Sequence, residues 1–279
     1  MKKIVVIVIM SFLCTAAQAQ KGSLEKRDFQ IGAFTGLELS GVMEATVEHS
    51  ASHTLSIETY SDVFDYLDVK VRGGILQIGF KNGGLPRAIQ RKYRNLEILC
   101  KVTLPELNSL GLSGVTKVYV KDNFKTDRMN IELSGVTKAD LLYMTCHDLD
   151  IEVSGVSELK MNGEAEQVNM EISGASKGFF VFEGKSITFA DIGISGSGNV
   201  TLKGKAIRSS LDISGAAGFE GREFEVEAMK AAVSGVGKAQ VSVLGSLEPE
   251  VSGAAKLRYN RNASLRNVKT SGAAQLTSY

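Results

Sequence analysis

Residues 131–136 read Ile-Glu-Leu-Ser-Gly-Val, and residues 151–156 repeat the pattern as Ile-Glu-Val-Ser-Gly-Val. The Ser-Gly pair in this stretch recurs in ten units, and after a long first interval the steps are 21, 20, 19, 22, 19, 20, 18 and 19 residues. Such a regular period indicates a repeat architecture. The ten serines are Ser40, Ser113, Ser134, Ser154, Ser173, Ser195, Ser214, Ser234, Ser252 and Ser271.

The residues before each serine alternate between apolar and polar side chains. The positions one and three before the serine are apolar in almost every unit, as Leu133 and Ile131 show. The position between them is acidic in six units. These acids are Glu38, Glu132, Glu152, Glu171, Asp212 and Glu250. Alternation of this kind predicts a strand with one buried face and one wet face.

The glycine of each pair separates two strand-like stretches, so we interpret it as a corner. Glycine adopts positive φ or allows close backbone approach without steric cost. About twenty residues then complete one coil of an all-β parallel β-solenoid, whose neighbouring coils lie about 4.8 Å apart. We expect the serine hydroxyls to hydrogen-bond to one another along this stack. A device that recurs in every coil belongs to the architecture, so we assign no catalytic role to these serines.

The chain divides into three parts in this interpretation. Residues 1–19 resemble a cleaved secretory signal, because Lys2 and Lys3 precede an apolar run that ends at the small residues Ala17-Gln18-Ala19. Residues 20–108 contain strand-like stretches without the regular repeat, and we expect them to cap the open end of the coil stack. Residues 109–279 form the regular solenoid. No later apolar run is long enough to span a bilayer, so we expect no transmembrane segment after signal removal.

Composition narrows the function further. Removal of Lys2 and Lys3 from 32 Lys and Arg leaves 30 against 31 Asp and Glu, so a net charge of −1 does not favour nucleic acid as a partner. Cys100 and Cys146 remain after signal removal; they fall at different phases of the repeat, and two buried thiols are favoured over a disulfide. The sequence leaves the oligomeric state open, including a homo-oligomer.

The chain resembles the auto-transporter adhesin head GIN domain family. The resemblance rests on Phe34-Thr35-Gly36-Leu37-Glu38-Leu39-Ser40-Gly41, on Gly74-Ile75-Leu76-Gln77-Ile78, and on Thr103-Leu104-Pro105-Glu106-Leu107-Asn108-Ser109-Leu110 followed by Leu112-Ser113-Gly114-Val115-Thr116-Lys117. It covers nearly all of residues 30–279. It implies a right-handed parallel β-helix exported to the cell envelope, with an adhesin-like role and no established catalytic residues.

The search for reactive chemistry yields little. Histidine occurs only at His49, His53 and His147, and the first two flank a predicted hairpin tip without a third ligand, so we expect no metal site there. Stacked acids such as Glu132 and Glu152 could share Ca²⁺, but a solvated face is favoured because no further ligands are evident. We therefore expect no metal, no cofactor and no catalytic residue, and we interpret the protein as a non-enzyme.

Two groups of cations are the candidate ligand-binding residues. The first is a column four positions after the serine, at Lys117, Lys138, Lys177, Lys238 and Lys256. The second lies in residues 69–96, a stretch without any acid that includes Arg87, Arg91, Lys92 and Arg94. Both groups suggest an anionic glycan or a lipid head group as ligand, although charged runs often serve only solvation.

The sequence therefore favours an exported, adhesin-like binding scaffold of the cell envelope. A periplasmic structural or lipid-binding protein is the main alternative, and a polysaccharide-degrading β-helix enzyme is less favoured, because the charged positions are spread evenly by the period. The expected location is the periplasm, the outer-membrane surface or the extracellular space. The identity of the ligand stays open.

Overall fold

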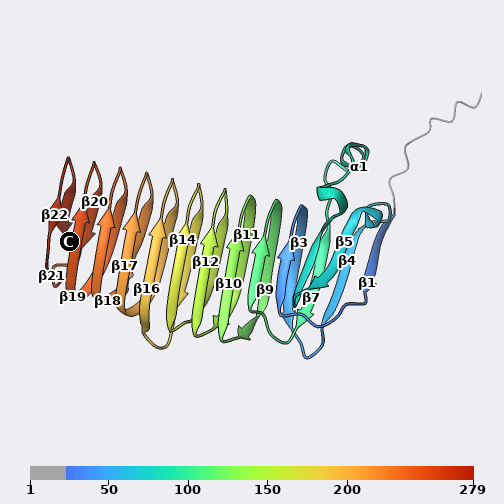
Figure 1. The fold of residues 1–279 in the computed structure, drawn as a ribbon, viewed down its shortest axis with the longest axis horizontal. Coiled ribbons are helices and arrows are strands. Elements are labelled where there is room, and N and C mark those ends of the chain that lie inside the picture. The colour runs from blue at the N-terminus through green and yellow to red at the C-terminus, as the bar shows by residue number, and fades with distance from the viewer. Residues whose placement is uncertain (1–22) are drawn as a thin grey trace, which may run out of the picture.

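The computed structural model describes residues 23–279, so the predicted signal at residues 1–19 lies outside the described residues. The described chain forms an elongated stack of β-coils, with its first strands at one end and its last strands at the other (Figure 1). Glu132 pairs with Glu152 and Glu152 pairs with Glu171, both in parallel register. These offsets of 20 and 19 residues confirm the predicted all-β parallel solenoid of about twenty residues per coil.

The first sheet consists of the strands that run into the Ser-Gly corners, with two further strands at its outer end. In spatial order these are β5 (Leu67–Arg72), β6 (Ile75–Phe80), β2 (Gly36–Leu39), β8 (Ser109–Leu112), β10 (Arg128–Leu133), β12 (Asp148–Val153), β14 (Gln167–Ile172), β16 (Ile187–Ile194), the second halves of β17 (Asn199–Ile213), β18 (Gly218–Val233) and β19 (Lys238–Val251), and the short β21 (Ser264–Leu265) and β22 (Lys269–Thr270). Within this sheet only the pair of β5 and β6 is antiparallel among the described residues.

The second sheet consists of the strands that leave the corners, again with further strands at the outer end. In spatial order these are β1 (Leu24–Phe29), β4 (Thr54–Tyr60), β7 (Leu99–Leu104), β3 (Val42–His49), β9 (Val115–Lys125), β11 (Val136–Thr145), β13 (Glu158–Glu164), β15 (Lys177–Phe182), the first halves of β17, β18 and β19, β20 (Lys256–Tyr259) and β23 (Gln275–Ser278). Strand β4 is antiparallel to both β1 and β7.

Spatial order departs from chain order at the outer end of the stack. The coil formed by β2 and β3 stacks directly on the coil formed by β8 and β9, although about seventy residues separate them in the chain. The intervening segment returns outward and adds β4 to β7, with the short 3-10 turns Phe64–Tyr66 and Lys81–Gly83 and the helix α1 (Arg87–Lys92). The proposed boundary at residue 108 stays a prediction.

Helix α1 occupies the place of a corner. The segment 81–98 joins the end of β6 in the first sheet to the start of β7 in the second sheet, which is what a Ser-Gly pair does in the regular coils. Figure 1 shows α1 projecting beyond the row of corners at the end of the stack where the chain begins. We call residues 81–98 the α1 loop.

The core is a continuous layer between the two sheets. Inward side chains of equivalent positions stack on one another, as Leu110, Ile131 and Ile151 do at 0%, 0% and 2% exposure. Burial of one such aliphatic side chain contributes about 1.5–3 kcal/mol. The alternation read from the sequence therefore places one face of each strand in a shared core and leaves the other face for charged side chains.

Two constraints require glycine at each corner: the backbone angles and the close approach of the neighbouring corner. Gly135 and Gly155 have φ values of 89° and 77°, a region that disfavours residues with a Cβ. A Cβ on Gly155 would lie 2.4 Å from the carbonyl oxygen of Gly135. The close approach serves a hydrogen bond, because the N–H of Val156 donates to that same oxygen at 2.8 Å. Each corner thus rests on the backbone of the corner before it.

The expected ladder of serine hydroxyls is wrong. The Oγ atoms of Ser134 and Ser154 donate to the carbonyl oxygens of Leu112 and Leu133, at 3.4 and 3.3 Å, and these oxygens also accept the serine N–H groups. The physical reason is spacing: coils lie about 4.8 Å apart, whereas an O–H···O hydrogen bond spans about 2.5–3.0 Å. Equivalent serines are oriented alike, so their hydroxyls keep the coil spacing, whereas hydroxyls that point toward each other do bond across coils, as Thr137 does to Ser157 at 2.8 Å.

Substitution of a corner glycine tests this account. We expect Gly155→Ala to lower the free energy of unfolding by more than about 2 kcal/mol, because strain at positive φ costs about 1–2 kcal/mol and the backbone contact adds to it. Gly73→Ala is the matched control, since Gly73 has a φ of 59° but no atom within 4 Å of a Cβ placed there. Urea unfolding of both variants measures the difference, and equal losses would contradict the stacking argument.

Candidate ligand-binding surfaces

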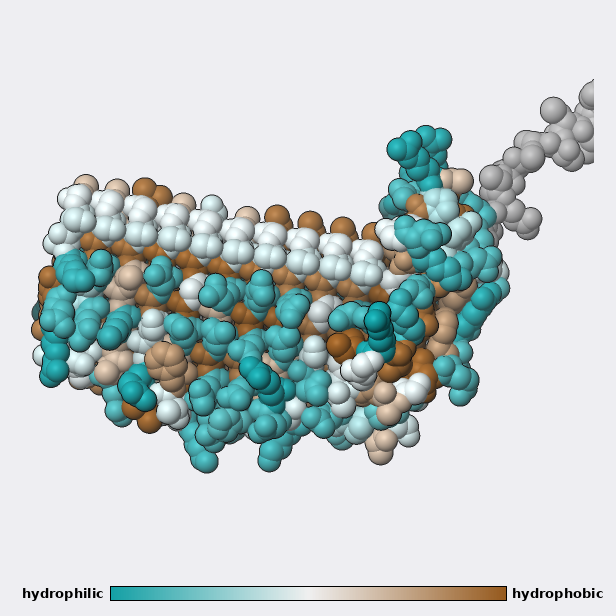
Figure 2. Space-filling model, in the orientation of Figure 1, coloured by the Kyte–Doolittle hydropathy of each residue, from teal (hydrophilic) through white to brown (hydrophobic). Residues whose placement is uncertain are grey.

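The row of Ser-Gly corners forms one long edge of the molecule, which we call the corner edge. Each unit contributes a serine, a glycine and then valine, alanine or serine, so the row contains no charged residue. Figure 2 shows this edge as a continuous pale strip with apolar side chains along its crest. Val136 and Val156 are more than half exposed there. The candidate charged residues therefore lie on the two sheet faces and on the α1 loop.

The acidic column of the first sheet is in register, as predicted. Glu132, Glu152 and Glu171 are direct neighbours on β10, β12 and β14. The side-chain amide of Asn130 donates to Glu132 at 2.9 Å. Among residues 23–279 no group of three or more His, Cys, Asp or Glu side chains is arranged to hold a metal ion.

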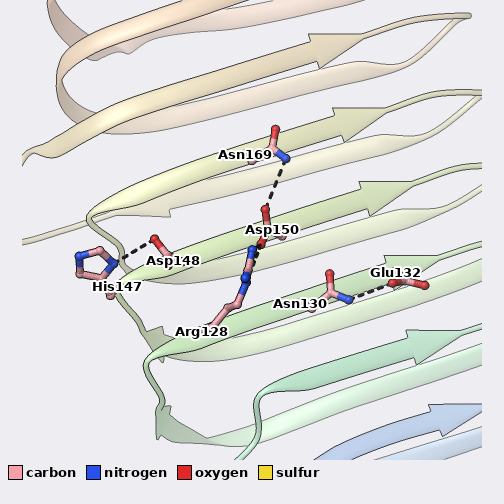
Figure 3. A network of polar contacts seen from close by, with 7 residues as sticks. All are labelled: Arg128, Asn130, Glu132, His147, Asp148, Asp150 and Asn169. Carbon is pink, nitrogen blue, oxygen red and sulfur yellow. Dashed lines mark hydrogen bonds and ion pairs between the residues drawn. The ribbon is translucent and has the colours of Figure 1, made fainter.

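A polar network links neighbouring coils beside this column (Figure 3). Arg128 forms an ion pair with Asp150 at 2.8 Å, and Asn169 donates to the same carboxylate at 3.4 Å. His147 contacts Asp148 at 2.9 Å, and this hydrogen bond raises the pKa of the imidazole above its ordinary value. Asp150 thus has donors from the coils on both sides, whereas the contacts of His147 with Asp148 and of Asn130 with Glu132 lie within one coil.

The other two histidines are held by local contacts. The Nε2 atom of His53 lies 3.0 Å from the carbonyl oxygen of Phe34. The ring of His49 packs edge-on against Phe124, with centroids 5.6 Å apart. The structure places these two rings in separate environments and does not bring them together as a pair.

The lysine column of the second sheet is interrupted. Lys117 is the neighbour of Lys138, and Lys238 is the neighbour of Lys256, but other residues occupy the positions between these pairs. In spatial order the column reads Glu44, Lys117, Lys138, Glu158, Lys177, Asn199, Gly218, Lys238, Lys256 and Gln275. The column is thus two pairs of lysines and a single lysine, not a continuous ladder.

The two acids in this column neutralise part of it. Glu158 lies 3.3 Å from Lys138 and 3.2 Å from Lys160. Burial opposes ionisation of Glu158, but the hydrogen bonds from Lys160 and Lys138 outweigh it and hold the pKa of this carboxyl below its ordinary value. Lys117 lies 3.9 Å from Glu44. Within residues 23–279, the remaining three predicted lysines have no ion-pair partner. They are Lys177, Lys238 and Lys256.

The α1 loop carries the second group of predicted cations. Arg87, Arg91 and Arg94 are exposed, and in the described part of the chain none of them has an acidic partner. Lys92 differs, because its Nζ atom lies 2.8 Å from Asp62. The structure therefore divides the four predicted residues into three solvent-facing arginines and one lysine that attaches the loop to the body.

Asp62 is the attachment point of the α1 loop. Its carboxylate accepts hydrogen bonds from Lys92 at 2.8 Å and from the hydroxyl of Tyr93 at 2.7 Å. The rings of Tyr60 and Tyr93 stack beside it with centroids 4.0 Å apart. Burial opposes ionisation of Asp62, but the two hydrogen bonds outweigh it and hold the pKa of its carboxyl below the ordinary value of 3.8.

Two hollows on the second sheet were not anticipated from the sequence. One, of about 600 Å³, lies over Gly218 between Asn199 and Lys238. The other, of about 430 Å³, lies where the α1 loop descends, and its lining includes Val42 and Leu99. The sequence does contain a signal for the hollow over Gly218. Gly218 stands at the solvent-facing position four residues after Ser214, where other units carry a lysine or another polar residue. The second depends on the excursion of residues 50–108.

The two cysteines are free thiols. Cys100 and Cys146 are both buried and unpaired, which answers the question the sequence left open. Burial raises the pKa of each thiol to about 12, so neither is reactive at neutral pH. In the described chain, residues 23–279, no helix is both long and apolar enough to cross a membrane.

Comparison with known proteins places this fold. A family model described as "Putative auto-transporter adhesin, head GIN domain" matches residues 33–178 and 176–263, which is more than half of the chain. None of the curated proteins compared with the chain matches it.

Solved structures share the architecture. A putative adhesin from Parabacteroides merdae is 18% identical, with a TM-score of 0.67, and one from Parabacteroides distasonis is 19% identical, with a TM-score of 0.64. A protein named a putative lipid binding protein from P. distasonis is 18% identical, with a TM-score of 0.61. Each alignment covers 92% of this chain and 97% of the other. At these identities the likeness shows the fold alone.

Asp62→Asn should loosen the α1 loop. Loss of the charge weakens both hydrogen bonds to this partly exposed carboxylate, which should raise the open population of the loop several-fold. Limited trypsin digestion at neutral pH measures the opening of the loop, which should appear as faster cleavage after the loop arginines. Asp65→Asn is the control, because only the backbone carbonyl of Asp65 contacts the loop, through Lys81. Equal cleavage of both variants would show that Asp62 does not anchor the loop.

Acid should have the same effect on the unmodified chain. The pKa of Asp62 is depressed by folding, so its contribution is fully present above the ordinary pKa of 3.8 and is lost as pH falls through the lower folded value. Contacts between the rings of Tyr60 and Tyr93, followed by NMR from neutral pH to about pH 2, should persist until the pH is below 3.8. Loss of the contacts well above that pH would contradict a lowered pKa for Asp62.

Proposed function

The chain belongs to the family described as "Putative auto-transporter adhesin, head GIN domain", and on this basis we propose that it is an exported, adhesin-like binding scaffold of the cell envelope with an anionic ligand. The solenoid supplies an elongated body whose outward side chains form columns along the stack. The proposed ligand is an anionic glycan or a lipid head group, and the proposed location is the periplasm, the outer-membrane surface or the outside of the cell.

The observation that supports this proposal is the construction of the α1 loop. An 18-residue connection, 81–98, stands where a regular coil uses a two-residue corner, and it projects beyond the corner edge (Figure 1). Arg87, Arg91 and Arg94 on this projection have no acidic partner among the described residues, while Asp62 holds its base. A fixed projection with unpaired guanidinium groups is suited to phosphate, sulfate or carboxylate groups, which arginine binds in a bidentate manner.

A lipid-binding role is the second candidate. Val42, Leu99 and Val115 are exposed apolar residues that line the hollow of about 430 Å³ at the foot of the α1 loop. An apolar hollow beside unpaired cations is a suitable arrangement for a lipid whose head group is anionic. Glu44, Glu97 and Lys117 also line the hollow, so its charge is net negative and we assign the head group to the loop arginines instead.

Neutralisation of the loop arginines tests the anion-binding role. We expect Arg87→Gln/Arg91→Gln/Arg94→Gln to weaken binding to phosphatidylglycerol vesicles or to dextran sulfate at least tenfold, because each cation near an anionic surface contributes about 1 kcal/mol. Co-sedimentation at low and high salt measures the effect, and salt should weaken binding of the original chain.

The matched control is Lys125→Gln/Lys185→Gln/Arg261→Gln, which removes the same charge from exposed positions away from the loop. Vesicle binding without polymer binding would favour the lipid candidate, and the reverse would favour a glycan. Undiminished binding by the loop variant, or equal loss in the control, would refute a role for the α1 loop.

A further inference from the structure

The hollow over Gly218 lies inside a grid of outward side chains on the second sheet. Its first row, four residues after each serine, is Lys177, Asn199, Gly218 and Lys238, each the register neighbour of the next. Its second row, two residues further along each strand, is Phe179, Thr201, Glu220 and Gln240, again in register. The missing side chain at Gly218 opens a depression of about 600 Å³ between Asn199 and Lys238.

The sides of the depression differ in character. Ala216 and Val236, two exposed residues of the corner edge, give the depression an apolar lining on that side. Polar side chains surround it, and Gln240 is held on both sides, because its amide N–H donates to Glu220 at 2.7 Å and its oxygen accepts from Arg222 at 2.8 Å. Lys238 is exposed and has no ion-pair partner among residues 23–279. Phe179, 42% exposed, extends the same surface by two coils.

These groups match the chemistry of a carboxylated sugar. A pyranose ring presents apolar C–H faces, which the apolar side chains of Ala216 and Val236 in the depression can contact. Its hydroxyl groups both donate and accept hydrogen bonds; the side chains of Asn199 and Thr201 supply both functions, and Glu220 supplies an acceptor. The carboxylate of a uronic acid would pair with Lys238. A glycerophosphate head group uses fewer of these groups, because it lacks a ring of hydroxyls.

We infer that the Gly218 depression is a binding site for a uronic acid unit of an acidic polysaccharide, with Lys238 as the carboxylate partner. This inference rests on the proposed anion-binding function and names its ligand class. The polysaccharide would run along the coil axis, where Lys256 follows Lys238 at the next coil and Lys177 lies beyond Asn199. The site is separate from the α1 loop, so each can fail without the other.

Gly218 allows a direct test, because the depression can be filled without breaking the fold. Its φ lies outside the positive region, and the nearest atom to an added Cβ is the flexible Oδ1 of Asn199. Gly218→Val should therefore occupy the depression at little cost in stability. Gly193→Val is the matched control, since Gly193 is also an outward glycine without positive φ but lies on the first sheet. Lys238→Gln and the exposed first-sheet Lys230→Gln form a second pair.

The experiment is titration calorimetry of the full chain with oligogalacturonate and with its methyl ester. We expect the original chain to bind the acid, the ester to bind at least tenfold more weakly, and Gly218→Val and Lys238→Gln each to lose at least tenfold in affinity. Both control variants should stay within twofold. Thermal unfolding confirms that each variant is folded.

Undiminished binding by folded Gly218→Val, or equal affinity for acid and ester, would overturn the inference. Absence of oligogalacturonate binding by the original chain would overturn it too, while retained binding to vesicles or dextran sulfate would leave the proposed function standing. Loss of all these interactions would refute both.

Discussion

The hydrogen bond from one corner to the next is the constraint on which the rest of the structure depends. The N–H of the residue after each glycine reaches the glycine carbonyl of the preceding corner, as Val136 does to Gly114 at 2.8 Å. That distance is possible only if the intervening residue has no Cβ and accepts positive φ. Once the corners are fixed at this spacing, the strands on both sides are in register, the apolar columns stack into one core, and outward side chains form columns whose order is set by the repeat.

Much of this architecture can be predicted from the sequence, because every coil repeats the same physical problem. The Ser-Gly period, the alternation that ends at Leu133, and the glycine corner together give the coil length, the core columns and the register of Glu132 with Glu152. The role of the serine hydroxyl was predicted wrongly, since composition shows a donor but not which acceptor lies nearest. Residues 50–108 fold back and place β6 and β7 outside the first coil. This path could not be predicted, because the segment contains no Ser-Gly repeat.

The candidate sites were predictable only in part, for a related reason. The repeat identifies which residues share a column, but it does not give their partners. Glu158 stands at the same position of the repeat as the lysines and neutralises Lys138. Asp62, thirty residues earlier in the chain, forms an ion pair with Lys92, which is therefore not a free cation like the loop arginines. Conversely, Gly218 gains interest because the positions on either side of it carry side chains. The ion-pair partners and the side chains beside Gly218 both come from neighbouring coils or distant segments. The residue types in one column do not reveal them.

The winding of the chain also determines how such a body responds to force. Backbone hydrogen bonds run along the stack, so tension between its two ends loads the bonds of successive coils in series. One coil occupies about 4.8 Å of the axis, but its twenty or so residues span roughly 66 Å when extended. Detachment of a terminal coil would therefore lengthen the molecule more than tenfold locally and dissipate work, while the remaining coils kept their shape. A scaffold built in this way yields one coil at a time under load.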